Sequence, residues 1–268
     1  MPRGEIHWRI GTMGFSYKDW RGPFYPTTLK PAGYLSFYAR QFDTAELDTT
    51  FHAIPPADRV ASWAAVVPED FRFIPKAPKA ITHEPTLADK AELFGQFARS
   101  LAPMGPKLAA VLMQFPPTFG IEMKDELNGL LDRISHRLPI AVEIRHRSWF
   151  DGKSLPALQQ RGVIVVANDH ESRAQPVLGP SERIYVRLKG FHEAFQSYDQ
   201  EQLDVTERLA WWMNQAEARV KPGGTIYVIA SNDYAGFAPA TVRRLRTLVG
   251  LPDLTPQPGT AEAGSLFG

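Results

Sequence analysis

Eight short apolar runs alternate with amphipathic segments along this chain, and the alternation constrains the fold more than any other feature. The runs are Trp8–Gly11, Thr44–Leu47, Arg72–Lys76, Ala109–Gln114, Ile140–Glu143, Val163–Ala167, Ile184–Leu188 and Ile226–Ala230. The amphipathic segments lie near 33–42, 57–66, 87–101, 123–136, 153–161, 200–219 and 238–249. Short strands that alternate with helices predict parallel βαβ units.

Eight such units in about 250 residues match a TIM (β/α)8 barrel better than an open doubly wound sheet. The sequence has no glycine-rich phosphate-binding motif of the kind that would favour the open sheet. We therefore predict an α/β fold, with a single-domain TIM barrel over residues 1–250 and a flexible Pro/Gly/Ala-rich tail over 251–268. The connection after the sixth run, NDHESRAQPVLGPSER, predicts a loop in place of a regular helix.

Composition narrows the classes of function. The 268 residues include 30 basic and 29 acidic side chains, so the net charge of +1 gives no general attraction to nucleic acid or membranes. The chain has no cysteine, which excludes disulfides, thiolate catalysis and sulfur-bound zinc. No signal peptide or membrane span is indicated. We expect a cytoplasmic protein without a membrane partner or nucleotide cofactor, in which any divalent metal would be bound by His, Asp or Glu.

The segment IAVEIRHRSW, residues 140–149, places charge on the inner face of a buried strand. Ile140, Val142 and Ile144 alternate with Glu143 and Arg145, so the two charged side chains share one face. An unpaired ion in that position costs several kcal/mol. These two side chains are therefore either paired or used in a functional site.

Polar side chains also mark the ends of most other runs. At the carboxyl ends of the strands, where barrel enzymes build their sites, the sequence places Glu46, Asp48, Lys76, Gln114, Glu143, Arg145, Asn168, Asp169, His170, Arg187, Lys189, Ser231, Asn232 and Asp233. This convergence predicts a polar site at the C-terminal mouth of the barrel.

Several of these residues have structural interpretations as well. Glu143 and Arg145 could form an ion pair that plugs the barrel. Arg187 and Lys189 are in phase on one strand and repel each other unless an anionic ligand, or the carboxylate of Glu46 or Glu143, lies between them. Both alternatives remain open at the level of sequence.

Other candidates are open in the same way. Lys76 could be a solvated loop residue, His83 could cap a helix, and Asn232 could begin a turn. A dense aromatic group could line a pocket or cover the rim of the barrel; it consists of Phe15, Tyr17, Trp20, Phe24 and Tyr25.

Six segments in a fixed order carry a family resemblance: GTMGFSYKDWRGPFYP, AELDTTFHAIP, DFRFIPKAPKAITHE, LMQFPPTF, VEIRHRSWF and YVRLKG. Together they resemble the YecE-like family, domain of unknown function 72, over residues 9 to about 250. The resemblance implies a TIM barrel without an assigned activity. Asp48 and His52 replace the commoner Asn and Tyr of that family, and Ala230, Ser231 and Asn232 replace its frequent F-N-N pattern.

Carried over residue by residue, the resemblance implies a pocket formed by Tyr17, Trp20, Glu46, Thr50, Lys76, His83, Gln114, Glu143, Arg145, Trp149, Arg187 and Asn232. Lys189 is added to this list because it lies on the same face of its predicted strand as Arg187. The catalytic candidates are Glu143, Glu46, Lys76 and His83, with Glu143 as the general base. The metal requirement is unknown, and the candidate ligands are Glu46, Glu143, Asp169 and His170.

We interpret Glu143 as ionised by Arg145 or Lys76, and Arg187 with Lys189 as the binding site for an anionic group. The predicted reaction is a proton transfer or hydrolysis on a phosphorylated or carboxylated small molecule, in a hydrolase- or isomerase-type enzyme.

The end of the tail supports an alternative function, that of a sliding-clamp-associated protein that binds DNA or processes it as a metal-dependent nuclease or repair enzyme. Leu266 and Phe267 form an apolar pair similar to the peptide by which bacterial DNA-processing proteins dock on the sliding clamp, although the Gln that usually opens that peptide is missing. In this alternative, the aromatic segment 15–25 engages an unstacked base, and Arg145, Arg187 and Lys189 contact phosphates of nucleic acid.

Overall fold

The computed structural model describes residues 5–134, 138–170 and 174–252 of the chain. Its strands are β1 (His7–Met13), β2 (Thr44–Leu47), β3 (Arg72–Pro75), β4 (Val111–Gln114), β5 (Ile140–Glu143), β6 (Ile164–Val165), β7 (Ala167–His170), β8 (Ser181–Gly190) and β9 (Val220–Ala230). They pair in parallel as a six-stranded sheet, in the order β3-β2-β1-β9-β8-β7, and a three-stranded sheet, in the order β4-β5-β6. The α/β class and the parallel pairing predicted from the alternation are confirmed.

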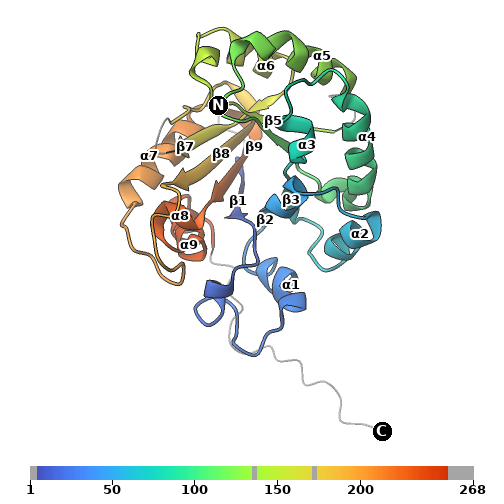
Figure 1. The fold of residues 1–268 in the computed structure, drawn as a ribbon. Helices are drawn as coiled ribbons and strands as arrows, with labels where there is room; N and C mark the ends of the chain where they lie inside the picture. The colour runs from blue at the N-terminus through green and yellow to red at the C-terminus, as the bar shows by residue number, and fades with distance from the viewer. Residues whose placement is uncertain (1–4, 135–137, 171–173, 253–268) are drawn as a thin grey trace.

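The predicted closed barrel differs from the observed pairing, because the described residues form two sheets rather than one closed hydrogen-bonded ring. The predicted sixth strand divides at Val166: β6 pairs with β5, whereas β7 pairs with β8. On the other side, β3 and β4 meet only through isolated bridges, Phe73 to Leu108 and Lys76 to Leu112. Figure 1 shows the strands grouped about a centre with the helices outside them.

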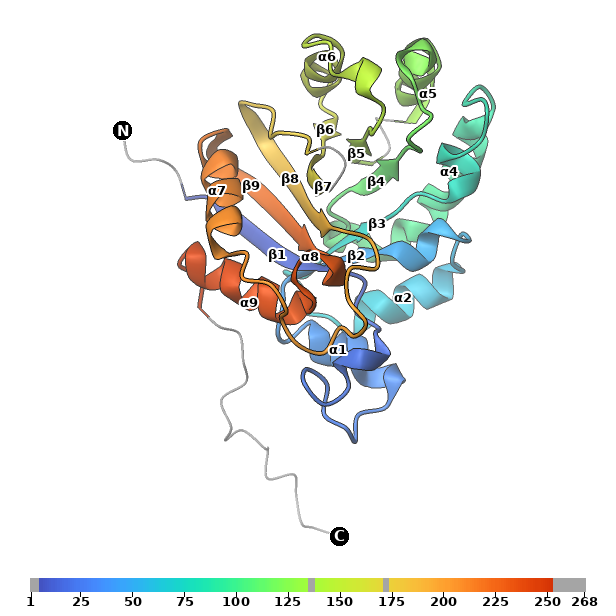
Figure 2. The same cartoon turned by 60° about the vertical axis from the view of Figure 1, so that its left-hand side comes forward.

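The α-helices occur close to the predicted amphipathic segments. They are α1 (Tyr34–Tyr38), α2 (Ala57–Ala65), α3 (Lys79–Thr82), α4 (Lys90–Leu101), α5 (Lys124–Ile134), α6 (Ser154–Gln160), α7 (Thr206–Glu217), α8 (Asn232–Ala235) and α9 (Ala238–Leu248). Short 3-10 helices span Lys18–Trp20, Pro31–Gly33, Asp48–Phe51, Ala102–Lys107, Ile121–Met123 and Arg147–Trp149. Figure 2 shows α7 and α9 on the outer side of the six-stranded sheet.

Hydrophobic periodicity explains how these helices pack. In α5, the side chains of Leu127, Leu130, Leu131 and Ile134 are buried. Their spacing of three and four residues places them on one face of the helix, while charged residues occupy the other face. No helix among the described residues combines the length and the apolar character needed to cross a bilayer.

The inner faces of the strands form a second, smaller apolar cluster. It includes Ile74, Leu112, Tyr185 and Tyr227, one side chain from each of four strands. At Gly11, a Cβ atom would lie 1.8 Å from the carbonyl oxygen of Thr44 on the neighbouring strand, so only glycine permits the observed approach of β1 to β2. The charged side chains described next lie beyond this cluster, toward the carboxyl ends of the strands.

Candidate functional site

Arg187 is the centre of a buried charge network that connects the two sheets. Its side chain is 1% exposed. Nε lies 2.9 Å from Oε2 of Glu46, and Nη2 lies 2.6 Å from Oε1 of the same carboxylate. Nη1 donates to Oε2 of Glu143. Glu46 belongs to β2 and Glu143 to β5, so one guanidinium joins carboxylates from both sheets.

The remaining hydrogen bonds of the network enclose both carboxylates. Tyr185 donates its hydroxyl to Glu46 Oε2. Gln114 Nε2 and Arg145 Nε each lie 2.9 Å from Oε1 of Glu143. Burial opposes ionisation of Glu143, yet the guanidinium groups of Arg187 and Arg145 hold its pKa well below the usual range.

Two open questions from the sequence are answered by these contacts. Glu143 and Arg145 form an ion pair, and Arg187 pairs with Glu46 and Glu143. The expectation that Arg187 binds an external anion is therefore not supported, because its nitrogen atoms already face carboxylate partners. A carboxyl group as acidic as that of Glu143 is also a weak general base at neutral pH, which argues against that role.

A pocket of about 800 Å³ lies beside this network. Residues at or just after the carboxyl ends of the strands contribute to it, including Met13, Gln114, Gly190 and Ser231. This is the edge of a parallel sheet at which α/β proteins commonly bind ligands. The pocket is lined by Met13, Tyr17, Asp48, Phe51, His52, Lys76, Gln114, Pro117, Arg145, His170, Arg187, Lys189, Gly190, His192, Ser231 and Asp233.

Lys189 lines this pocket and makes no side-chain hydrogen bond or ion pair with the residues that the structure describes. Burial and the neighbouring charge of Arg187 lower the pKa of its ammonium group to about 8, against an opposing effect of Glu143. A lysine with that pKa is present in both its neutral and its charged form near physiological pH. It can therefore donate or accept a proton.

Lys76 is the second lysine of the pocket and has a different environment. Its Nζ atom lies 3.6 Å from Oδ1 of Asp48 and 4.1 Å from the centre of the Phe51 ring. Burial lowers the pKa of Lys76, and the carboxylate of Asp48 partly offsets this effect. The alternative of a solvated loop residue is thus excluded, because the side chain is largely buried between an acid and an aromatic ring.

The structure divides the predicted site residues into three groups. Those that line the pocket are Tyr17, Lys76, Gln114, Arg145, His170, Arg187 and Lys189. Glu46 and Glu143 are fully buried behind it, bound to Arg187. Those that do not line it are Trp20, Thr50, His83, Trp149, Asn232 and Asp169.

The residues of the third group have structural contacts instead. Thr50 donates to the carbonyl oxygens of Leu47 and Lys76 at 2.8 and 2.7 Å. Trp149 is buried and donates Nε1 to the carbonyl oxygen of Phe119 at 3.1 Å. These contacts fix loops around the pocket without exposing a functional group to it.

His83 lies near the pocket but outside its lining. Its Nδ1 atom is 2.9 Å from the Thr82 hydroxyl, and its ring centre is 5.0 Å from that of Phe51. Burial, with the charges of Lys76 and Arg145, lowers its pKa, which favours neutral imidazole. None of these contacts tests a catalytic role for His83, which stays a prediction.

The aromatic group of residues 15–25 mostly covers the rim. Trp20 and Tyr25 are fully buried, and Trp20 Nε1 donates to Oδ1 of Asn232 at 3.0 Å. Only Tyr17 of this group lines the pocket. Trp20, Phe24 and Tyr25 are buried and cannot stack on an unpaired base, which leaves Tyr17 as the ring of this group that faces the pocket.

The metal candidates are held in other ways. Asp169 accepts hydrogen bonds from Arg208, from Trp212 at 2.7 Å and from Tyr234 at 2.8 Å. It thereby ties β7 to α7 and α8. Among residues 5–134, 138–170 and 174–252, no group of three or more His, Asp or Glu side chains is arranged to hold a metal ion. The clamp candidates Leu266 and Phe267 lie outside the described residues.

Sequence reasoning missed three pocket residues of interest. Met13 ends β1, and its Sδ atom lies 3.6 Å from Nη2 of Arg187. Phe51 lies under the ammonium group of Lys76. His192 follows β8, and its Nδ1 atom is 3.8 Å from Oδ2 of Asp233. Phe51 lies within AELDTTFHAIP, one of the six segments that carry the family resemblance, and this position could have identified it as a pocket residue.

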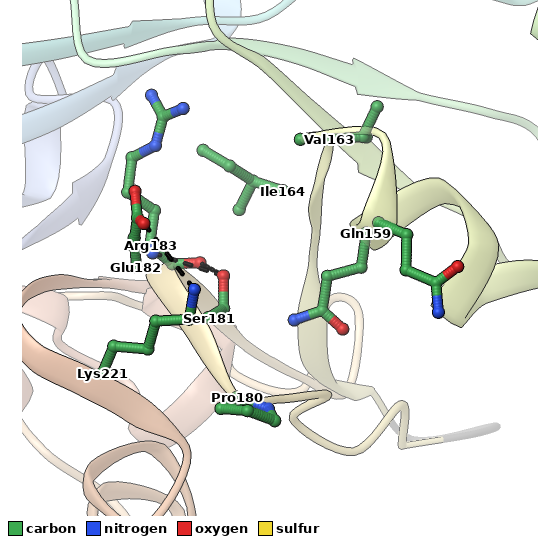
Figure 3. A pocket seen from close by; sticks show the side chains of 10 residues that line it. Gln159, Val163, Ile164, Pro180, Ser181, Glu182, Arg183 and Lys221 are labelled. Carbon is green, nitrogen blue, oxygen red and sulfur yellow. Dashed lines mark hydrogen bonds and ion pairs between the residues drawn. The ribbon is translucent and has the colours of Figure 1, made fainter.

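A smaller hollow of about 280 Å³ lies at the opposite, amino-terminal end of β8 (Figure 3). Its walls include Gln159, Ile164, Ser181, Arg183 and Lys221. None of the sequence-predicted site residues lines it. The candidate site at the carboxyl ends is thus the one in which the predicted residues gather.

Parallel strands, surrounding helices and a charged pocket at the carboxyl ends of the strands define an α/β protein with a ligand-sized site in the usual position for this class. Within this class, the chain belongs to the family described as "Protein of unknown function DUF72", whose family model matches residues 9–262. The resemblance inferred from the six segments is confirmed.

Two relatives support the assignment. The UPF0759 protein YunF of Bacillus subtilis (strain 168) is 37% identical over 150 residues, which are 53% of this chain and 51% of that protein. The UPF0759 protein YecE of Escherichia coli (strain K12) is 33% identical over 134 residues, 48% of this chain and 49% of that protein. The chain thus spans about half the length of these relatives.

Two crystal structures have a similar fold. A DUF72 family protein of Thermotoga maritima MSB8 superposes with a TM-score of 0.73 at 25% identity and covers 91% of this chain and 99% of its own. A DUF72 family protein of Enterococcus faecalis V583 gives a TM-score of 0.71 at 24% identity and covers 92% of this chain and 98% of its own. The latter likeness concerns the fold alone.

Proposed function

We propose that this protein is an enzyme that acts by acid–base chemistry on a small anionic substrate, a carboxylate or a phosphate, in the pocket at the carboxyl ends of the strands. We also infer that the two sheets act together as an incompletely hydrogen-bonded barrel, with this pocket at its mouth. The observation that carries the functional proposal is Lys189, a partly buried amine that lines the pocket without a hydrogen-bond or ion-pair partner among the described residues.

The pairing of the other charges supports a distinct role for Lys189. Arg187 is balanced by Glu46 and Glu143, and Lys76 lies beside Asp48. A buried ammonium without a partner is unfavourable, and it becomes favourable when an anion enters or when it loses its proton. In this proposal, Lys189 rather than Glu143 is therefore the group that transfers the proton.

The anionic group of the substrate would be bound by Arg145 and Lys76. Arg145 uses Nε for Glu143, and the described residues provide no hydrogen-bond partner for its two Nη atoms. Its side chain is 26% exposed and lines the pocket. A guanidinium edge that faces a pocket is suited to bidentate contact with a carboxylate or phosphate.

The two glutamates act as positioning residues in this proposal. Glu46 and Glu143 hold Arg187 in place, and burial together with the positive charge of Arg187 lowers the pKa of Lys189. Glu143 also orients Arg145. The network would thus set both the position and the acidity of the groups that face the substrate.

Ligand-observed NMR on the full-length protein tests this proposal. The probes are a panel of small carboxylates and phosphate monoesters, offered to the wild type, to Lys189→Met and to Lys153→Met. Lys153 is an exposed lysine outside the pocket and serves as the matched control. We expect at least one probe to bind the wild type and Lys153→Met and to lose affinity in Lys189→Met. Equal binding to all three proteins would contradict the proposed site.

A further inference from the structure

Lys189 differs from the other cations of the pocket because no carboxylate holds its charged group. The guanidinium of Arg187 binds Glu143, and the Nζ atom of Lys76 lies 3.6 Å from Oδ1 of Asp48. Within the described part of the chain, Lys189 has no such partner. An amine held in an ion pair keeps its proton and has no lone pair to share, whereas an unpaired amine can lose the proton and react with an electrophile.

Asp233 is the carboxylate whose backbone lies against the end of β8, yet its side chain contacts other groups. Its Oδ1 atom accepts a hydrogen bond from the Tyr198 hydroxyl, and its Oδ2 atom lies 3.8 Å from Nδ1 of His192. A Cβ atom at Gly190 would lie 2.3 Å from the carbonyl oxygen of Asp233, so only glycine allows α8 to pack this closely beside Lys189. The amine therefore keeps its access to the pocket without an ion pair to this acid.

Arg187 gives Lys189 a fixed positive neighbour. The two residues are separated by one position on β8, so their side chains project to the same face of the strand. Glu46 and Glu143 hold Arg187 in place. Burial, followed by the charge of Arg187, lowers the pKa of Lys189 to about 8. Lysines that are desolvated or lie beside a second cation are the ones that proteins use to form imines with carbonyl compounds.

Arg145 provides the anchor for a substrate that would meet this amine. Its side chain lines the same pocket, of about 800 Å³, and uses Nε for Glu143. The charge of Arg145 also acts on the ammonium group of Lys189, so the two groups interact across the pocket. A small molecule bound to Arg145 through a carboxylate or phosphate would place its adjoining carbon atoms beside the amine of Lys189.

We propose that Lys189 forms an imine with the carbonyl carbon of a small aldehyde or ketone that carries a carboxylate or phosphate group. This inference rests on the function proposed for the same pocket and names its substrate class. An imine withdraws electrons from the neighbouring carbon, so proton transfer at that carbon becomes easier.

The reaction balances without an oxidant or a reductant. The ammonium group of Lys189 first loses a proton to solvent, which is the proton transfer already assigned to this residue. The neutral nitrogen then attacks the carbonyl carbon, and a proton passes from nitrogen to the carbonyl oxygen, which becomes a hydroxyl group. The remaining proton on nitrogen passes to that hydroxyl group, which leaves as water while the C=N bond forms.

Reductive trapping on the full-length protein tests this proposal. The wild type is incubated with pyruvate and sodium cyanoborohydride at pH 8, which converts an imine into a stable secondary amine, and peptide mass spectrometry measures the adduct at each lysine. We expect at least about tenfold more adduct on Lys189 than on the exposed Lys153, because a far larger fraction of Lys189 is neutral at this pH. Lactate carries the same carboxylate without a carbonyl group, and an excess of it should reduce the labelling of Lys189.

Matched variants locate the adduct independently. Lys189→Arg keeps the positive charge but cannot form an imine, so the intact protein should lose most of its adduct. Lys153→Arg should retain it. The peptide map of the wild type needs no variant, and the test therefore stands even if Lys189→Arg fails to fold. Equal adduct on Lys189 and Lys153 in the wild type would overturn the proposal.

The outcomes separate this proposal from the function on which it rests. Binding of simple carboxylates or phosphates in the NMR experiment, without excess adduct on Lys189, would refute the imine and leave the anion-binding enzyme standing. Selective labelling of Lys189 by the neutral ketone butanone, without protection by lactate, would support the imine and count against an anionic substrate. More adduct from pyruvate than from dihydroxyacetone phosphate would identify a carboxylate substrate, and the reverse order a phosphate.

Discussion

Nη2 of Arg187 lies 2.6 Å from Oε1 of Glu46, although 141 residues separate them in the sequence. Both side chains are almost completely buried, and the same guanidinium also binds Glu143 of the other sheet. Removal of one member of a buried ion pair leaves the other charge without compensation. We therefore expect this contact to affect the stability of the fold as well as the proposed mechanism.

Replacement of Arg187 by Met should lower the free energy of unfolding by about 3–5 kcal/mol, because the buried carboxylate of Glu46 would lose its ion pair and Glu143 would keep Arg145 alone. Urea denaturation followed by circular dichroism measures the change. Arg99→Met is the matched control, since Arg99 and Glu92 form an exposed pair at 3.2 Å. The control should change stability by no more than about 0.5 kcal/mol. Similar losses in the two variants would show that the network contributes no special stability.

Substitution of alanine for Gly11 should destabilise the fold by about 3 kcal/mol or more, since the new methyl group overpacks the contact between β1 and β2. The Cβ atom would lie 1.8 Å from the carbonyl oxygen of Thr44. Gly129→Ala in α5 is the control, because a Cβ atom there meets nothing within 4 Å. It should stabilise the protein by about 0.5–1 kcal/mol through the helix preference of alanine. Thermal unfolding of both variants decides the prediction, and a neutral Gly11→Ala would contradict it.

The stability difference between Lys189→Met and the wild type should depend on pH. The pKa of Lys189 falls from 10.5 to about 8 on folding, so the folded protein binds fewer protons than the unfolded chain between these values. The unfavourable effect of the buried charge is therefore fully present below pH 8 and decreases as the pH rises toward 10.5. Lys189→Met should be the more stable protein at pH 7, by a margin that decreases toward pH 10. Urea denaturation across this range measures it, and a margin independent of pH would refute the shifted pKa.

Acetylation by acetic anhydride should distinguish Lys189 from ordinary lysines. At pH 8 about half of a group with a pKa near 8 is neutral, against under about 1% of an unperturbed lysine. The rate of Lys189 acetylation should therefore level off above pH 8, whereas the rate at Lys153 continues to rise. Peptide mass spectrometry gives both rates from one sample. Parallel pH profiles for the two lysines would show that their pKa values do not differ.

Strand positions were largely predictable where an apolar run was bounded by turn residues. The run Thr44–Leu47 and the run Ile140–Glu143 match β2 and β5 at both ends. The strands β8 and β9 are longer than predicted, because they begin with polar segments that still pair, with Ser181 opposite Val220. Backbone pairing at these ends depends on the neighbouring strand. Hydrophobic periodicity therefore cannot predict where these strands begin.

The sequence predicted which side chains of the site project inward from the strands, but it did not predict which groups those side chains contact. Strand phase indicated that Glu143 and Arg187 project inward, and they do. Whether Arg187 meets a substrate or two glutamates depends on which strands face each other across the centre. Asn232 shows the same limit: its side chain accepts hydrogen bonds from Trp20 and from the backbone of Ala238, and both contacts arise only in the folded protein.

The order of strands in the six-stranded sheet has a consequence for synthesis of the chain. The last strand of the described residues, β9, lies between β1 and β8, and it pairs with β1 from His7 to Thr12. As the ribosome releases the chain, β1 can pair with β2 on one side, but its other edge has no native partner until Val220–Ala230 emerges. An unpaired strand edge is open to contacts with other chains. The nascent protein therefore carries an exposed edge on β1 until β9 emerges and covers it.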